Sequence, residues 1–435
     1  MTKKPPPRRS TPSTAKPSAS KGSTRAKLAT SSRSTSSSAA AGRSSAKSKS
    51  GLSGLALLGG GCVSTTTIII GLILVCIVGS YLALNLNDEG DETATRAPIT
   101  PGSTRVTSNN PPTPSPIDAD WYEIYFTEAT CPPEEERGEG LDSIIAETIA
   151  QAEIGVDIAV FELDSEPIVN ALIGLEEQGI PVRVVVDTDY IEEASIRRLR
   201  RNGISVVEDD RSAFMHNKFT VIDERYVWVG SMNYMPNDVY CNNNNLVWFD
   251  SPELAANYTV EINEMYEDRS FGPRSPVNTP AEQLNLYGVS VENYFASETK
   301  VAPIIGELVN QAQSEILFMA FSFTHEDIGE AILERAEAGV AVQGVFETTG
   351  SNQDFSYYTI MSEENLPTVQ IAQDGNPRIM HHKVIIIDRQ TVIFGSFNFS
   401  GNANDSNDEN VIVIHDATFA SFFVDEFFQV WEERR

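Results

Sequence analysis

From residue 119 onward, short apolar runs alternate with segments of helical period, and the alternation occurs twice. The apolar runs that predict strands are 121–126, 155–161 and 180–187, then 294–295, 316–323 and 340–347. The helical periods between them cover 141–153 and 167–178, then 301–313 and 326–338. Nearly continuous β-branched runs separated by helices are typical of a sheet that is covered on both faces. The pattern therefore predicts an α/β fold that is built twice.

The first 118 residues follow a different pattern. Residues 1–50 are mainly Ser, Thr, Ala, Pro, Lys and Arg without a hydrophobic period, which predicts a disordered basic tail. Residues 63–86 carry no charge and are long enough to cross a bilayer as one helix. Residues 87–118 are rich in Pro, Ser and Thr and predict a stiff linker. We therefore expect a tail, a transmembrane helix, a linker and two related halves, 119–272 and 285–435.

The net charge of −29 conceals a strong asymmetry. Residues 1–50 hold twelve of the 32 Lys and Arg and no acidic residue, which leaves 20 basic against 61 acidic residues, a balance of −41. The basic segment precedes the apolar span, so the tail is expected in the cytoplasm and everything after the single span outside it. The acidic balance argues against an extended nucleic-acid footprint, but it also disfavours an anionic membrane surface.

Four cysteines are too few for a disulfide scaffold. Two of them, Cys131 and Cys241, each follow a predicted strand of the first half and would lie in an oxidising compartment, so they are a candidate disulfide. No carboxylate and histidine cluster with metal-ligand spacing occurs. We therefore predict no metal and no other cofactor, and no obligate protein partner is evident.

The two halves carry one motif in duplicate: His-x-Lys, four residues, Asp, six residues, Gly-Ser-x-Asn. The first copy consists of His216, Lys218, Asp223, Gly230, Ser231 and Asn233. The second copy consists of His381, Lys383, Asp388, Gly395, Ser396 and Asn398. Every matched pair differs by 165 positions, which indicates an internal duplication that brings two half-sites together.

These residue types suit phosphate chemistry. His and Lys two positions apart on a strand project to the same side. The Lys ammonium binds phosphate, and imidazole acts as a nucleophile or general acid near neutral pH. Gly lets the backbone turn closely, and the Asn amide adds donors beside the Lys. The motif therefore predicts phosphoryl-ester chemistry without metal.

The doubled motif resembles that of the phospholipase D superfamily. The resemblance implies a bilobal, internally duplicated α/β fold, with two mixed sheets covered by helices and one active site at the seam. One histidine would form a phosphohistidine while the other protonates the leaving oxygen. The residues that match the catalytic positions are His216, Lys218, His381 and Lys383, with Asp223 and Asp388 completing the motif in a more structural capacity. The residues that match the phosphate-binding positions are Asn233, Asn398, Ser231 and Ser396.

The two histidines are not equivalent in this sequence. Glu409 matches an acidic residue that hydrogen-bonds the catalytic imidazole in many members of the superfamily, so we include it in the catalytic set. The offset of 165 places Asn244 at the same point of the first copy. A carboxylate stabilises imidazolium better than an amide does. We therefore expect Glu409 to make His381 the more basic histidine. In the superfamily the earlier histidine is usually the nucleophile, and we assign that role to His216.

The resulting hypothesis is a membrane-anchored, extracytoplasmic phosphodiesterase of phospholipase D type that acts on a phospholipid head group. The alternative is an extracytoplasmic endonuclease of the same superfamily that cuts DNA or RNA. A third hypothesis is an inactive phosphate-binding module, because Asn244 stands where the second copy has the carboxylate of Glu409.

Overall fold

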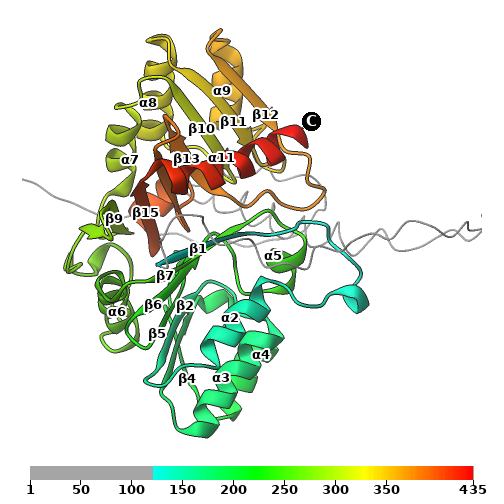
Figure 1. Cartoon of the computed structure of the whole chain (residues 1–435), viewed down its shortest axis with the longest axis vertical. Coiled ribbons are helices and arrows are strands. Elements are labelled where there is room, and N and C mark those ends of the chain that lie inside the picture. Colours follow the sequence, from blue (N-terminus) through cyan, green and yellow to red (C-terminus); the bar gives the residue numbers. More distant parts are fainter. Residues whose placement is uncertain (1–120, 435) are drawn as a thin grey trace, which may run out of the picture. The chain divides into compact units, whose positions relative to one another are not determined.

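The computed structural model describes residues 121–434, which form two mixed sheets flanked by helices (Figure 1). The predicted tail, transmembrane helix and linker all precede residue 121 and lie outside the described residues. Within residues 121–434, every helix is too short or too polar to cross a bilayer.

The sheet of the first half has seven strands in the order β1-β7-β6-β5-β2-β3-β4. Its strands are β1 (Tyr122–Phe126), β2 (Val156–Val160), β3 (Val182–Val186), β4 (Ser205–Glu208), β5 (Lys218–Ile222), β6 (Tyr226–Gly230) and β7 (Asn245–Asp250). Strands β2, β3 and β4 pair in parallel, and all other neighbours are antiparallel. The sheet is mixed, as expected.

The sheet of the second half repeats this order. Its strands are β8 (Gln283–Leu286), β9 (Val289–Ala296), β10 (Glu315–Ala320), β11 (Ala341–Phe346), β12 (Val369–Gln373), β13 (Lys383–Ile387), β14 (Thr391–Gly395) and β15 (Glu409–His415). The order β12-β11-β10-β13-β14-β15-β9 corresponds strand for strand to β4-β3-β2-β5-β6-β7-β1, and β8 is added at the edge. The duplication predicted from the motifs thus extends to the whole sheet.

Helices cover both faces of each sheet. The helices of the first half are α2 (Leu141–Ile149), α3 (Glu166–Gln178), α4 (Ala194–Arg201), α5 (Pro236–Tyr240) and α6 (Pro252–Tyr266). Those of the second half are α7 (Val301–Val309), α8 (Glu326–Glu337), α9 (Tyr357–Glu364), α10 (Gly401–Asp405) and α11 (Ala417–Glu432). Three single turns of 3-10 helix complete the set: η1 (Glu134–Glu136), η2 (Thr188–Tyr190) and η3 (Gly272–Arg274).

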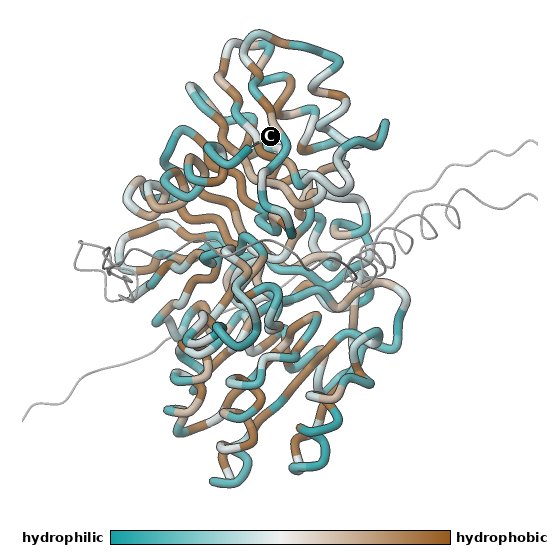
Figure 2. Tube along the Cα trace, turned by 90° about the vertical axis from the view of Figure 1, so that its right-hand side faces the viewer, coloured by the Kyte–Doolittle hydropathy of each residue, from teal (hydrophilic) through white to brown (hydrophobic). Residues whose placement is uncertain are grey.

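One hydrophobic core is shared by the two halves. It joins one face of each sheet with α6 and α11, for example through Val221, Tyr258, Ile386 and Phe423. The opposite faces have separate cores against α2–α4 and α7–α9. Figure 2 shows the apolar residues concentrated along the strands. Because both faces of each sheet are covered, every residue of β5 and β13 is buried, and the motif strands are held rigidly.

Two pairs of glycines mark matched turns. Helices α3 and α8 are followed by Gly179 and Gly339, whose φ angles of 77° and 99° favour glycine. At the ends of β6 and β14, a Cβ on Gly230 would lie 2.2 Å from the carbonyl oxygen of Asn245. A Cβ on Gly395 would lie 2.3 Å from the equivalent oxygen of Asn410. The repeated motif glycine is therefore required for close backbone approach, as expected.

The largest boundary differences from the predictions lie at the matched helices α2 and α7 and at β9; α7 ends at Val309 instead of 313. Helix α2 ends at Ile149 instead of 153, because the chain then turns so that residues 153–155 can donate backbone N–H groups to Asp223. Strand β9 is longer than the predicted run at 294–295 and forms a hairpin with β8, which begins just before the predicted start of the second half. Strand β8 is a four-residue edge strand, too short to show a period.

Candidate active site

The two His–Lys pairs lie at the starts of β5 and β13, in the middle of their sheets. The four side chains are buried, with exposed fractions between 0 and 6%. Lys218 Nζ donates to the carbonyl oxygen of His216 at 2.7 Å, and Lys383 Nζ donates to that of His381 at 2.6 Å. Each ammonium is therefore fixed beside its histidine by the same contact in both halves.

The seam joins each histidine backbone to the other half. His216 N donates to the carbonyl oxygen of Asp408 at 2.9 Å, and His381 N donates to that of Asn243 at 2.9 Å. Short parallel bridges accompany both contacts, Met215 with Asp408 and Met380 with Asn243. The segment that follows α5 or α10 thus crosses to the opposite half-site, and a single site is assembled from two halves.

A phenylalanine follows β2 and β10 at matched positions and forms a wall of each half-site. Phe161 contacts the His216 ring edge-on at 5.0 Å between centroids, and Phe321 contacts that of His381 at 4.8 Å. The two lysine Nζ atoms lie 5.3 Å and 4.7 Å from the same rings. The attraction between an ammonium and an aromatic face offsets part of the free-energy cost of burying the charge. Sequence reasoning missed both residues, although Phe161 ends one predicted strand and Phe321 lies within another.

Glu409 pairs with His216, so its expected assignment to His381 is wrong. Its Oε2 lies 2.7 Å from His216 Nδ1, and its Oε1 accepts from Asn407 Nδ2 at 3.1 Å. The carboxylate is fully buried. The reason is that the chain crosses to the first half at this point. Asp408 pairs with Met215 of the first half, and Glu409, the next residue and the first of β15, therefore lies beside His216.

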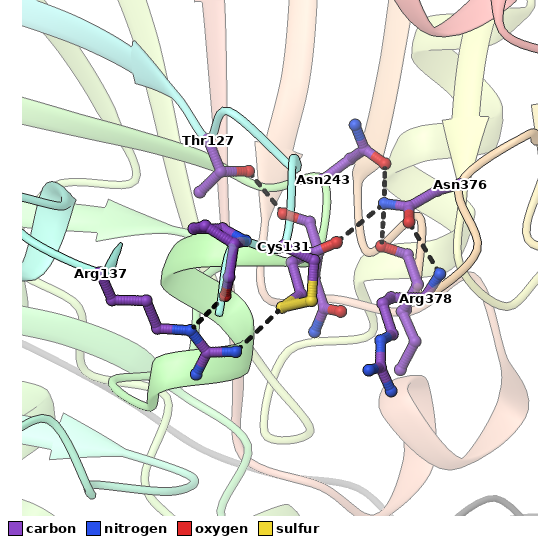
Figure 3. The surroundings of a disulfide bond; sticks show 10 residues. Thr127, Cys131, Arg137, Asn243, Asn376 and Arg378 are labelled. Atoms are coloured by element: carbon purple, nitrogen blue, oxygen red, sulfur yellow. Dashed lines mark hydrogen bonds between the residues drawn. A yellow bond between two sulfur atoms is a disulfide. The ribbon is translucent and has the colours of Figure 1, made fainter. Parts of the chain in front are cut away.

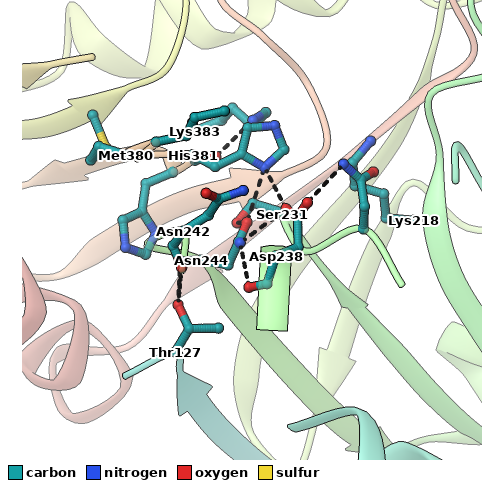
Figure 4. Close-up of polar contacts among 12 residues, drawn as sticks. Thr127, Lys218, Ser231, Asp238, Asn242, Asn244, Met380, His381 and Lys383 are labelled. Atoms are coloured by element: carbon teal, nitrogen blue, oxygen red, sulfur yellow. Dashed lines mark hydrogen bonds and ion pairs between the residues drawn. The ribbon is translucent and has the colours of Figure 1, made fainter. Parts of the chain in front are cut away.

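The hydrogen-bonding partners of His381 Nδ1 come from the first half (Figure 4). Its Nδ1 lies 3.0 Å from Asn244 Oδ1 and 3.2 Å from Asp238 Oδ1. Asn244 Nδ2 in turn donates to Asp238 Oδ1 at 3.1 Å. Asp238 lies on α5, is 2% exposed, and was missed from the sequence because its counterpart in the second copy is Ala403. A comparison of the two repeats points only to positions at which both repeats carry the same residue type.

Burial governs the protonation of the site. Burial, with Lys218 and Lys383, holds the pKa of His216 well below its ordinary value. Burial and Lys383 lower the pKa of His381 to about 3, against the opposing effect of Asp238. Burial also lowers the pKa of Lys218 to about 8 and raises that of Glu409 to about 7. Both imidazoles are therefore neutral at pH 7 in the free site, and an anionic phosphate would favour protonation.

The motif serines contact the partners of the histidines. Ser231 Oγ donates to Asn244 Oδ1 at 2.9 Å, and Ser396 Oγ donates to Glu409 Oε2 at 2.7 Å. The same hydroxyls accept from the backbone N–H groups of Asn245 and Asn410. Through these contacts Ser231 and Ser396 orient the partners of the histidines, and phosphate binding by the two hydroxyls stays a prediction.

The motif asparagines keep unused hydrogen-bonding capacity. Among the described residues, the buried Oδ1 atoms of Asn233 and Asn398 have no hydrogen-bond partner. Asn233 Nδ2 makes only a long contact, 3.4 Å, to Asp238 Oδ2. A buried amide without full pairing is costly unless a ligand completes it. Phosphate binding by these two amides stays a prediction.

The motif aspartates lie at the far ends of β5 and β13 from the histidines. Asp223 accepts from the backbone N–H groups of Glu153, Ile154 and Gly155 at 2.7–3.1 Å. Asp388 accepts in the same way from residues 313–315 at 2.7–2.9 Å. Both therefore fix the loop that precedes β2 or β10 and do not belong with the catalytic residues.

Cys131 and Cys241 form a disulfide beside the site (Figure 3). Cys241 directly follows α5, and its carbonyl oxygen accepts from Asn376 Nδ2 at 3.0 Å. The same Nδ2 atom donates to Asn243 Oδ1. The disulfide and Asn376 thus hold the segment that crosses the seam to His381.

Within residues 121–434, no group of three or more His, Cys, Asp or Glu could hold a metal ion.

Known proteins resemble this chain at the level of family and fold. A family profile described as "Cardiolipin synthase, PLD-like domain" matches residues 145–266 and 305–431. A phospholipase D from Rickettsia bellii is 31% identical over 164 residues, which cover 36% of this chain and 78% of that protein. A mitochondrial cardiolipin hydrolase from Chlamydomonas reinhardtii is 31% identical over 114 residues, which cover 26% of this chain and 51% of that protein.

Among solved structures, a phosphatidylserine synthase from Haemophilus influenzae matches with a TM-score of 0.57. The match covers 73% of this chain and 87% of that one at 14% identity, so it bears on the fold alone. The family profile covers both halves and includes both copies of the motif. The chain therefore belongs to the phospholipase D-like family.

Proposed function

We propose that this chain is a phosphodiester hydrolase that works through a phosphohistidine on His216, with a phospholipid head group as its preferred substrate. The observation that carries the proposal is the convergence of two buried His–Lys pairs, one from each half. Each imidazole is held at Nδ1, which leaves Nε2 as the reacting nitrogen.

The reaction would have two steps. In the first, His216 Nε2 attacks phosphorus, the bond to the leaving oxygen breaks, and His381 Nε2 gives its proton to that oxygen. In the second, His381 takes a proton from water, the water oxygen attacks phosphorus, and the phosphorus–nitrogen bond breaks. A phosphate monoester leaves, and both histidines return to their starting forms. Lys218 and Lys383 would neutralise the charge of the phosphate oxygens.

The choice of His216 as nucleophile rests on its partner. Glu409 gives it a full carboxylate contact at 2.7 Å, and a phosphorylated imidazole carries positive charge that such a carboxylate stabilises. His381 shares its Nδ1 between an amide and a carboxylate at longer distances. The corrected pairing thus removes the objection that Glu409 favours the other histidine.

The substrate proposal rests on charge and on the named relatives. Burial raises the pKa of Glu162 to about 8, and the nearby Glu193, Asp238 and Asp164 add to the rise. Of these, Glu162 and Asp238 lie near Lys218, whose charge lowers the pKa of each. Such surroundings suit a single phosphodiester better than a polyanion. A membrane anchor at 63–86, with the catalytic part outside the cytoplasm, would place the site beside lipid.

The nuclease alternative has one observation in its favour. Helix α4 carries Arg197, Arg198, Arg200 and Arg201 in a domain that is otherwise strongly acidic. Three of these arginines are exposed. A basic helix of this kind could hold a nucleic-acid backbone. An inactive phosphate-binding module is the remaining alternative.

A substrate panel tests the proposal. The full chain, in detergent micelles with EDTA, is incubated with phosphatidylcholine, phosphatidylglycerol, cardiolipin or single-stranded DNA. We expect release of phosphatidate or free head group from at least one lipid, and loss of that release in His216→Ala and His381→Ala. The matched control is His415→Asn, because His415 lies at the opposite end of β15 from Glu409. Cleaved DNA with intact lipid would make the chain a nuclease, and phosphate binding without turnover would make it an inactive module.

A further inference from the structure

The two half-sites keep one histidine carboxylate each, but at different positions in the repeat. In the second half, Glu409 reaches His216 from β15, and the position that corresponds to Asp238 is Ala403. In the first half, the position that corresponds to Glu409 is Asn244, and the carboxylate comes from Asp238 on α5. The pair Asp238 with Asn244 therefore occupies the place of Ala403 with Glu409.

The contacts of the two arrangements match closely. Ser231 donates to Asn244 as Ser396 donates to Glu409, so the serine is used identically. Asn244 Nδ2 donates to both the backbone oxygen and Oδ1 of Asp238, at 3.1 Å each, and thereby orients the carboxylate toward His381. A small alanine at 403 leaves the first-half carboxylate without a counterpart in the second half. The exchange conserves one negative charge beside each imidazole.

We propose that Asp238 is the positioning carboxylate of His381 and takes in the first half the role that Glu409 has for His216. The proposal rests on the phosphodiesterase mechanism above. Asp238 acts through His381: it fixes the proton on Nδ1, so that Nε2 faces the leaving oxygen, and it stabilises the imidazolium that donates the proton. Asn244 alone, as an amide, holds the ring but supplies no charge.

Several charged groups act on this pair from the surrounding elements. Lys383 on β13 and Lys218 on β5 both oppose protonation of His381, and Asp238 favours it. Burial raises the pKa of Asp238, but His381, Asn244 and Lys218 together bring it below its ordinary value. The carboxylate therefore stays ionised across the neutral range. Removing it lowers the pKa of His381, so the pH at which His381 loses its proton moves down.

Two variants test the proposal. Asp238→Asn removes the charge and keeps the volume. Asp238→Ala combined with Asn244→Glu copies the arrangement of the second half into the first. We expect Asp238→Asn to lower kcat by about 10²-fold or more, with KM changed far less, and to move the alkaline limb of the kcat profile to lower pH. We expect the double variant to recover activity to within about tenfold of the wild type. Its alkaline limb of the kcat profile should return to the wild-type pH.

A second readout needs no turnover. The full chain, labelled with ¹⁵N-histidine and saturated with inorganic phosphate, is titrated by NMR, and the five histidines are assigned through variants. The His381 midpoint should fall by about one pH unit in Asp238→Asn and return in the double variant. That result without turnover of any diester would leave the positioning role intact and remove the proposed function. An unmoved midpoint, or a double variant no more active than Asp238→Asn, would overturn the positioning role.

Discussion

His216→Ala should lower kcat/KM on the active phosphodiester by about 10⁴-fold or more. The substitution removes the atom that would bond to phosphorus, and no neighbouring group can replace it. Lys218 is tied to the carbonyl oxygen of residue 216, and Glu409 is fully buried behind the ring. The residual rate would come from phosphate binding by the two lysines. Initial rates across a range of substrate concentrations give the two kinetic constants.

The loss must be separated from a loss of folding. His216 is 6% exposed, so the alanine variant leaves a small cavity, and its thermal unfolding should be compared with the wild type. His415→Asn, at the opposite end of β15 from Glu409, should keep full activity. A His216→Ala protein that is folded and retains activity within tenfold of the wild type would exclude His216 as the nucleophile.

Removing the disulfide should give the largest loss of stability. The bond between Cys131 and Cys241 closes a loop with a sequence separation of 110. Chain-entropy arguments assign a loop of this length about 4–5 kcal/mol, as an upper figure. Cys131→Ala with Cys241→Ala should therefore lower the free energy of unfolding by roughly 2–5 kcal/mol, measured by urea denaturation.

Activity should fall together with stability in this variant. Asn243 and Asn244 contact His381 through backbone and side chain, and they lie two and three residues after Cys241. Greater mobility of that segment would widen the range of orientations that the His381 ring adopts. The matched control is Cys62→Ala with Cys76→Ala, which replaces the same number of cysteines. An unchanged denaturation midpoint in the Cys131/Cys241 variant would show that the native contacts hold the segment without the bond.

The fold was predictable because its main signals are local. Apolar runs and helical periods predicted three strands and two helices of each half, and the constant offset of 165 predicted the repeat. Both sheets then follow one strand order. The edge hairpin of β8 and β9 was mostly missed, because a four-residue edge strand with one buried residue carries too little pattern. Boundaries shifted where side chains such as Asp223 bind backbone groups of another segment.

The residues of the site were predictable, but not their pairing. The motif identified both His–Lys pairs, and Glu409 was recognised as a histidine partner. Its assignment to His381 assumed that a partner belongs to the histidine of its own repeat. The bridges between Met215 and Asp408, and between Met380 and Asn243, reverse that assignment. A pairing that depends on two chain segments crossing has no local signature.

Asp238 was missed for a related reason. It is a single aspartate in an acidic chain, and its repeat counterpart is alanine, so neither composition nor the offset points to it. The substitution of Asn244 for a carboxylate was the available signal: an imidazole that has lost its usual partner requires charge from elsewhere. That signal indicates a compensating residue but does not locate it.

The most direct test of the account is to identify the phosphorylated residue. The full-length His381→Ala variant, which keeps the nucleophile but lacks the general acid and base, is mixed with a diester bearing a good leaving group and quenched in alkali. Mass spectrometry of its peptides should place the phosphate on His216, and His216→Ala should carry none. Phosphate on another residue, or product formed with no covalent intermediate in any variant, would contradict the mechanism.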